Sequence, residues 1–221
     1  MNVLIKNLFS YIKDMRIVLV RHGESEYNPL NIIGGDPNLS EKGVEFANNL
    51  NKFIENNSKW FPKKCICSAK KRVQQTVGAF KNKMESILTS ENLNELNAGL
   101  CEEITYTQFY QMYTEEFTKR YQNKLSYRYP NGESYIDLIE RVRSIVEDIQ
   151  NKGEDVFIVS HQAVSRALMA HFTGENLEDI PHIDIPLHTL IVIEDGKKKG
   201  MISVGGVDMS DTLIQESFDF A

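Results

Sequence analysis

The chain has few cysteines, no excess of basic residues and no long apolar run, and each shortage argues against a class of protein. Three of its 221 residues are cysteine, an odd number without the partner spacing of a metal site. We expect buried, reduced thiols and a cytoplasmic location. The formal net charge of −6 argues against a nucleic-acid or membrane surface. No apolar stretch approaches the roughly 20 residues that cross a bilayer.

Two motifs are also missing. The five histidines show neither H-x-x-x-H nor H-E-x-x-H spacing, so we expect no metal ion and no cofactor. The phosphate-binding loop G-x-x-x-x-G-K-[ST] is absent, which excludes an ATP-dependent kinase of that type.

What is present is typical of one globular domain. Hydrophobic residues make up 41% of the chain and charged residues 25%, with no low-complexity tract or repeat. We expect this domain at 16–207, after an N-terminal extension at 1–15 and before a polar tail at 208–221. The extension carries an apolar stripe but no arginine and no cleavage signature. It is typical of a docked helix or a frayed end rather than of a targeting signal.

Apolar runs alternate with helical patterns along the domain. Strands are predicted at 17–20, 64–67, 87–89, 156–160, 190–194 and 201–204, the last two joined by an Asp195-Gly196 turn. Helices are predicted at 40–54, 68–81, 133–150 and 162–172, with one or two more in 105–121. Ser40 and Ser68 are the expected N-caps, and Val44 is expected on a buried stripe. This order predicts an α/β fold, a three-layer α/β/α sandwich around a mainly parallel sheet.

Two of the predicted strands each end at a histidine. Arg21-His22-Gly23 follows one, and His161-Gln162 follows another. Arg72 is expected in the first helical turn after a third strand, where a phosphate would also meet free N–H groups. Because ligands bind where the strands of such sheets give way to loops, we expect these side chains to share one crevice.

These residue types suit phosphoryl transfer. A neutral imidazole is a competent nucleophile near pH 7, and His22 is the predicted nucleophile. Arg21, Arg72 and His161 are the predicted donors to the negative charge of the transferring group. A carboxylic acid beside a phosphate would protonate the leaving oxygen, and Glu95 is preferred to Glu24 for this role.

Longer strings extend this interpretation to a known family. Residues 21–25, 39–43 and 160–162 resemble the histidine phosphatase superfamily, which includes phosphoglycerate mutases. Residues 33–36, 93–95, 99–106, 127–135, 161–166 and 186–189 resemble one branch more closely, the fructose-2,6-bisphosphatase domain of 6-phosphofructo-2-kinase/fructose-2,6-bisphosphatase. The likeness runs from about Met15 to Glu194.

The resemblance implies a phosphoglycerate mutase-like fold and a set of roles. His22 would carry the phosphoryl group, with Arg21, Arg72 and His161 around it and Glu95 as the acid that later activates water. Asn28 and Gly34 would also touch the phosphate. The implied sugar-phosphate contacts are Tyr106, Arg120, Lys124, Tyr135, Gln162 and Arg166.

Three functions stay open at this point. The first is a metal-independent phosphomonoesterase acting on a small sugar phosphate such as fructose 2,6-bisphosphate. The second is a phosphoglycerate mutase, although mutases of the superfamily typically have E-R-H-Y-G where this chain has Glu95-Leu96-Asn97-Ala98-Gly99. The third is a module that binds phosphate without turnover. The expected partner is a small-molecule phosphate ester, with no nucleic acid and no membrane, and the oligomeric state is left open.

Overall fold

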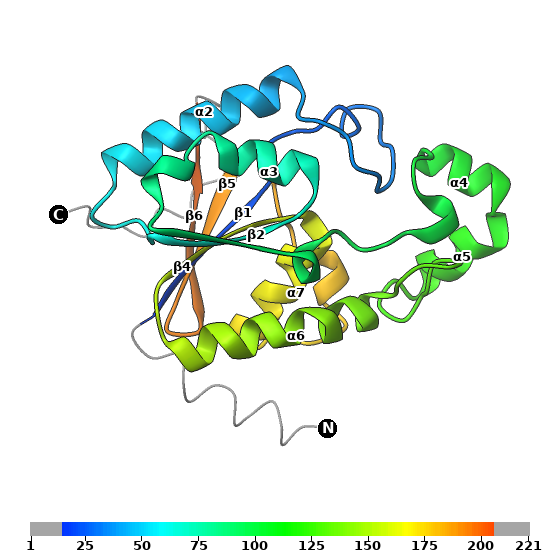
Figure 1. Ribbon diagram of the computed structural model, residues 1–221. Coiled ribbons are helices and arrows are strands. Elements are labelled where there is room, and N and C mark those ends of the chain that lie inside the picture. The colour runs from blue at the N-terminus through cyan, green and yellow to red at the C-terminus, as the bar shows by residue number, and fades with distance from the viewer. Residues whose placement is uncertain (1–14, 206–221) are drawn as a thin grey trace.

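The computed structural model describes residues 15–205, in which a six-stranded sheet lies between two layers of helices (Figure 1). The strands are β1 (Arg16–Arg21), β2 (Lys64–Ser68), β3 (Ser86–Ser90), β4 (Val156–Ser160), β5 (Thr189–Glu194) and β6 (Lys197–Ser203). Their order is β3-β2-β4-β1-β5-β6. The first four in sequence are parallel, and β5 and β6 are antiparallel. The predicted three-layer α/β/α sandwich is confirmed.

Helices cover both faces of the sheet. In Figure 1, α2 (Glu41–Asn56) and α3 (Lys71–Gly78) lie on one face, and α6 (Tyr135–Lys152) and α7 (Gln162–Thr173) lie on the other. The short helices α4 (Tyr106–Met112) and α5 (Thr114–Gln122) lie beyond the edge of these layers. Four 3-10 turns complete the described elements: η2 (Lys81–Lys83), η3 (Glu91–Leu93), η4 (Gly99–Cys101) and η5 (Ile180–His182).

The apolar runs of the central strands follow from burial on both faces. Along β1, Ile17 and Leu19 belong to the core under α6 and α7, while Val18 and Val20 belong to the core under α2 and α3. Strands covered on both sides read as continuous apolar runs, as β1 and β4 do. Met15, the last residue of the predicted extension, is buried in the first core. The predictions for residues 1–14 and for the tail at 208–221 lie outside the described residues.

Local sequence signals set most element ends. Ser40 accepts a hydrogen bond from the Gly43 N–H and caps α2. Gly153 adopts a left-handed conformation (φ 60°) and ends α6. The segment 105–121 forms two helices. Asp195 and Gly196 both have positive φ, 51° and 70°, as the two-residue hairpin turn predicted there requires.

Two helix predictions were wrong in detail. Ser68 does not cap α3, because the helix begins two residues later, after Lys70, and ends at Gly78 rather than near residue 81. Val44 is 50% exposed, since the buried stripe of α2 runs instead through residues such as Phe46 and Leu50. Among residues 15–205, no helix is both long enough and apolar enough to span a bilayer.

The strand register places the predicted chemistry at one edge. Arg21 at the end of β1 pairs with Ser160 at the end of β4, and the neighbouring β2 ends at Ser68. His22 and His161 are the next residues after β1 and β4. The parallel sheet therefore brings together two histidines that are well over a hundred residues apart along the chain.

Candidate active site

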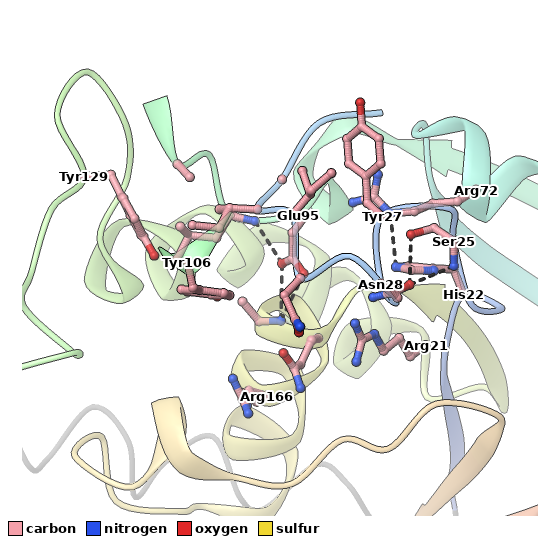
Figure 2. A pocket seen from close by; sticks show the side chains of 18 of the residues that line it. Arg21, His22, Ser25, Tyr27, Asn28, Arg72, Glu95, Tyr106, Tyr129 and Arg166 are labelled. Carbon is pink, nitrogen blue, oxygen red and sulfur yellow. Dashed lines mark hydrogen bonds between the residues drawn. The ribbon is translucent and has the colours of Figure 1, made fainter. Parts of the chain in front are cut away.

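A cavity of about 290 Å³ opens at this edge of the sheet. Every site residue predicted from the sequence lines it except His161, which is buried beside it. In Figure 2, its side chains converge from the end of β1, the loop after it, the segment around Glu95, and helices α4 and α7. Gly34 lines the wall with φ 63°, a left-handed conformation that favours glycine, and a Cβ there would meet the Glu102 carboxylate.

His22 is held in one tautomer from both sides. Its Nδ1 lies 2.7 Å from the carbonyl oxygen of Gly23, which can only accept, so Nδ1 carries the hydrogen. The Nε of Arg72 donates to Nε2 of His22 at 3.1 Å, which requires a lone pair on that nitrogen. Burial, followed by the charges of Arg72 and Arg21, lowers the pKa of His22 well below its usual value. The ring is therefore neutral, with Nε2 as its nucleophilic atom.

His161 lies directly against His22. The two ring centroids are 5.1 Å apart in an edge-to-face arrangement, and His161 is fully buried. Its Nε2 lies 2.8 Å from Oγ of Ser68. Burial and the charge of Arg72 lower the pKa of His161 well below its usual value, so this ring is also neutral.

Two buried arginines lie around the histidines, and one of their donors is unpaired. Arg72 is 4% exposed, and its Nη1 donates to the Gly35 carbonyl at 2.9 Å. The Nε of Arg21 and the Nδ1 of His161 are buried without a hydrogen-bond partner in the part of the chain that the structure describes. Buried polar atoms of this kind are normally paired. The Nε–H of Arg21 therefore remains available as a donor to an anion bound beside His22.

The two carboxylate candidates are separated by their positions. Glu95 lines the cavity and accepts from the N–H groups of Leu96 (2.9 Å) and Ala163 (3.2 Å), as Figure 2 shows. Ala163 lies in the first turn of α7, so the carboxylate sits at the positive end of that helix. Glu24 instead accepts from the Ser40 hydroxyl at 2.8 Å and does not line the cavity.

A second basic group forms the far part of the cavity. Arg120 donates to the Tyr129 hydroxyl at 2.7 Å, and Arg166 donates to the Tyr135 hydroxyl at 3.0 Å. Burial, with Arg166 and Arg120 nearby, lowers the pKa of Lys124 to about 8. Tyr129, which also lines the cavity, is not among the residues predicted from the sequence, although the aromatic run before Pro130 was a usable signal.

The balance of charge in the cavity is opposite to that of the whole chain. Five basic side chains line it, against the single carboxylate of Glu95; the basic ones are Arg21, Arg72, Arg120, Lys124 and Arg166. In a chain of net charge −6, this concentration focuses a positive field into the cavity. Within residues 15–205, no group of three or more His, Cys, Asp or Glu side chains is arranged to hold a metal ion.

Known proteins match most of this chain in sequence. The family model described as "Histidine phosphatase superfamily (branch 1)" matches residues 17–204. The 6-phosphofructo-2-kinase/fructose-2,6-bisphosphatase 3 of Rattus norvegicus is 40% identical over 181 residues, 82% of this chain and 32% of that protein. The 6-phosphofructo-2-kinase/fructose-2,6-bisphosphatase 4 of Homo sapiens is 42% identical over 182 residues, 82% of this chain and 38% of that one. The chain thus spans about a third of the length of these relatives.

Solved structures share the fold. YhfR of Bacillus stearothermophilus superposes with a TM-score of 0.72 at 27% identity, covering 83% of this chain and 94% of that one. The alpha-ribazole phosphatase of Shigella flexneri gives a TM-score of 0.73 at 24% identity, covering 81% and 90%. The phosphoglycerate mutase-like fold expected from the sequence is confirmed. With the family match over most of its length, the chain belongs to the histidine phosphatase superfamily.

Proposed function

We propose that this protein hydrolyses a small sugar phosphate without a metal ion, by way of a phosphoryl group carried on His22. The observation that carries the proposal is the fixed tautomer of His22, whose Nε2 lone pair faces a buried guanidinium at the end of the cavity. A neutral imidazole held in this way is a nucleophile that needs no separate base. The basic lining supplies the charge that a phosphate requires.

The first half of the reaction transfers the phosphoryl group. Nε2 of His22 attacks phosphorus, the bond from phosphorus to the sugar oxygen breaks, and Glu95 gives its proton to that oxygen. Arg72 exchanges its contact with Nε2 for a phosphoryl oxygen as the substrate binds. The unpaired Nε of Arg21 is placed to take another.

The second half returns the site to its starting state. Glu95, now a carboxylate, takes a proton from water as the water oxygen attacks phosphorus and the bond from phosphorus to Nε2 breaks. Phosphate leaves, and both His22 and Glu95 recover their initial protonation. Asn28, Gly34 and Gln162 line the same cavity and are the proposed neutral contacts to the substrate.

The far basic group supports a substrate with a second phosphate. Arg120, Lys124 and Arg166 lie around Tyr106 and Tyr135, with the Arg120 guanidinium 5.4 Å from the Tyr106 ring centre. Arginine and tyrosine together suit a sugar that carries a phosphate away from the reacting one. Because the curated relatives are named as fructose-2,6-bisphosphatases, we propose fructose 2,6-bisphosphate, hydrolysed to fructose 6-phosphate and phosphate.

The state of the cysteines supports a proposal for the cellular location. Cys65, Cys67 and Cys101 are free and buried in the structure. Unpaired thiols of this kind are typical of a reducing compartment, and we place the protein in the cytoplasm.

A substrate panel tests the function. Phosphate release from fructose 2,6-bisphosphate should continue in the presence of a metal chelator and exceed release from phosphoglycerates. Interconversion of 2- and 3-phosphoglycerate faster than phosphate release would favour a mutase instead. No release from any ester, including a chromogenic aryl phosphate, would favour a binding module and overturn the proposal.

Replacing Arg166 by alanine should weaken binding of the bisphosphorylated sugar. Loss of one charged hydrogen-bond donor to a phosphate costs about 1.5–3 kcal/mol, so KM for fructose 2,6-bisphosphate should rise about tenfold or more. KM for a small aryl phosphate should change much less, because that substrate does not reach the far part of the cavity. Steady-state kinetics on both substrates gives the comparison.

A matched arginine serves as the control. Arg143 is on the exposed side of α6, paired with Glu140, and Arg143→Ala should change neither KM. Equal effects of Arg166→Ala on the two substrates would place Arg166 outside the contacts to the second phosphate.

A further inference from the structure

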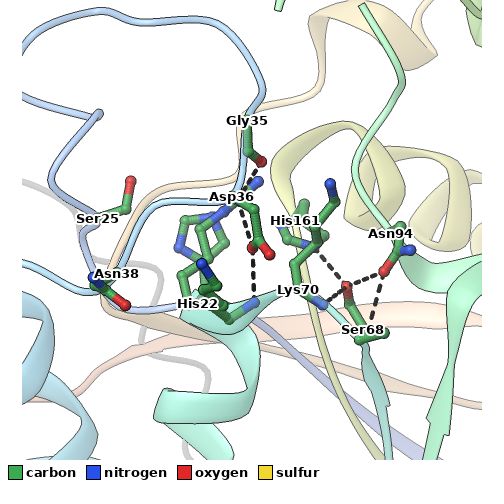
Figure 3. A network of polar contacts seen from close by, with 12 residues as sticks. His22, Ser25, Gly35, Asp36, Asn38, Ser68, Lys70, Asn94 and His161 are labelled. Carbon is green, nitrogen blue, oxygen red and sulfur yellow. Dashed lines mark hydrogen bonds and ion pairs between the residues drawn. The ribbon is translucent and has the colours of Figure 1, made fainter. Parts of the chain in front are cut away.

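Ser68, at the end of β2, belongs to a hydrogen-bond network whose proton positions are determined (Figure 3). The Ala69 N–H donates to Oδ1 of Asn94 at 3.1 Å, which identifies that atom as the amide carbonyl oxygen. Oγ of Ser68 lies 2.7 Å from the same oxygen. Because a carbonyl oxygen only accepts, the single hydroxyl proton of Ser68 points to Asn94.

With its proton committed, Ser68 can only accept from its other partners. These are the backbone N–H of Lys70 at 3.2 Å and Nε2 of His161 at 2.8 Å. Nε2 of His161 must therefore carry a hydrogen. His22 has the opposite arrangement, with its hydrogen on Nδ1, so the two facing rings are held in opposite tautomers.

In this tautomer, His161 has no N–H group that can donate a hydrogen bond to the reacting phosphoryl group. In the neutral ring Nδ1 has only a lone pair, and it is buried with no partner among the described residues. Since Nε2 is engaged by Ser68, any contact of this ring with a phosphoryl group must use Nδ1. That contact can be a hydrogen bond only if Nδ1 gains a proton, because phosphoryl oxygens are acceptors.

The surroundings of His161 favour a neutral ring until an anion arrives. The charged and titratable groups that act on it are Arg72 from α3, Arg21 and His22 from the end of β1, and Lys70 before α3. The carboxylate of Glu95, which lies against the N-terminus of α7, accepts hydrogen bonds from the N–H groups of Leu96 and Ala163. A phosphoryl dianion placed among these cations would reverse the local charge, which favours the imidazolium.

We propose that Ser68 and Asn94 are positioning residues that hold His161 as its Nε2–H tautomer, so that binding of a phosphoryl dianion takes up one proton at His161 Nδ1. The proton comes from solvent, or from the phosphate itself when it binds as the monoanion. No other bond forms or breaks in this step. The imidazolium then donates Nδ1–H to a phosphoryl oxygen while Nε2–H stays on Ser68. This inference rests on the proposed phosphatase function.

Proton uptake by the unmodified protein is the first test. Calorimetric titration with inorganic phosphate at about pH 8, where phosphate is mostly a dianion, is repeated in buffers of different protonation enthalpy. The dependence on buffer should correspond to an uptake of about one proton per phosphate bound. Phosphate binding without uptake would overturn the inference and leave the proposed hydrolysis intact, whereas failure of the protein to bind phosphate or release it from any ester would count against the proposed function itself.

Ser68→Ala tests the positioning role. By analogy with the outer partners of metal-bound histidines, we expect a loss of about 10- to 100-fold in activity. Without an acceptor at Nε2 the imidazolium in the complex is less stable, so the alkaline limb of the kcat profile, which reports ionisations of the enzyme–substrate complex, should move to lower pH. Nitrogen NMR of labelled histidine should show loss of the uniform Nε2–H state at His161. An unchanged alkaline limb and an unchanged tautomer would contradict the proposal.

Two further variants distinguish a role in positioning His161 from a general effect on folding. Ser90 pairs with Ser68 in the register of β2 and β3, and its hydroxyl oxygen accepts from the Asn92 N–H. Ser90→Ala should therefore leave the pH profile and the His161 spectrum unchanged. Asn94→Ala keeps the serine but frees its proton to point at Nε2 of His161. This variant should increase the Nδ1–H tautomer, and retention of pure Nε2–H would also contradict the proposal.

Discussion

Replacing His22 by alanine is expected to lower kcat by about 10⁴-fold or more, the loss typical of removing a covalent nucleophile. No other described side chain can take its place. His161, the neighbouring imidazole, has the hydrogen of its Nε2 on Ser68. In the proposed complex its Nδ1 carries a proton as well, so neither nitrogen offers a lone pair to phosphorus. The basic side chains of the cavity would still bind substrate, so KM should change much less than kcat.

The phosphorylated residue can be identified directly. During turnover of labelled substrate, a rapid alkaline quench preserves a phosphoramidate bond, and mass spectrometry should find the phosphoryl group on His22. The control is His182→Ala, since His182 is exposed in η5 and should leave kcat unchanged. Undiminished turnover by His22→Ala, or a phosphoryl group on another residue during full activity, would reject the mechanism.

The pH dependence of this nucleophile follows from its surroundings. Burial and the charges of Arg72 and Arg21 hold the pKa of His22 well below 6.5. Protonation of a base abolishes its lone pair, so activity would fall as pH drops below the pKa of the ring. Because that pKa is lowered, the nucleophile stays active through the range where an exposed histidine would already be charged.

The sequence predicted that the two histidines lie close together, because the strand before each of them can be recognised from its own apolar run. Apolar runs that end in His22 and His161 place both rings at strand ends, and a parallel sheet aligns those ends. No such sequence signal marks the residues that line the far part of the cavity. Arg120 and Tyr135 lie in segments whose helical patterns say only which face is buried, and their convergence on the site depends on how α5 and α6 are packed. Only the family resemblance pointed to them.

Ser68 shows why the remaining details could not be predicted. A serine between a strand and a helix is typical of an N-cap, and that was the expectation for Ser68. In the structure its hydroxyl bonds Asn94 and its oxygen accepts from His161, partners 26 and 93 residues away. The tautomer of His161 therefore depends on tertiary contacts. The tautomer of His22 depends partly on the carbonyl of Gly23, which is the next residue in the sequence.

Replacing Glu95 by glutamine should have an effect that depends on the leaving group. The amide keeps an acceptor for the Ala163 N–H, which now binds the Glu95 carboxylate, but it cannot give or take the catalytic proton. Loss of a general acid costs about 10²- to 10⁴-fold, so hydrolysis of a sugar phosphate, whose alkoxide needs a proton to leave, should fall by that amount. A nitrophenyl phosphate releases a stable phenolate and should still transfer its phosphoryl group rapidly to His22.

The second half-reaction provides a further test of the role of Glu95. Without a base to activate water, the phosphohistidine formed from the aryl ester should accumulate, giving a rapid burst of about one phenolate per protein followed by slow turnover. Glu24→Gln is the matched control, because Glu24 binds the Ser40 hydroxyl outside the cavity; it should show neither a burst nor a dependence on the leaving group. If Glu95→Gln slowed both esters equally with no burst, or if Glu24→Gln showed the burst instead, Glu95 would not be the proton donor. The positions of the two carboxylates would then have led to the wrong assignment. Glu24 would become the candidate for the proton donor and for the residue that activates water.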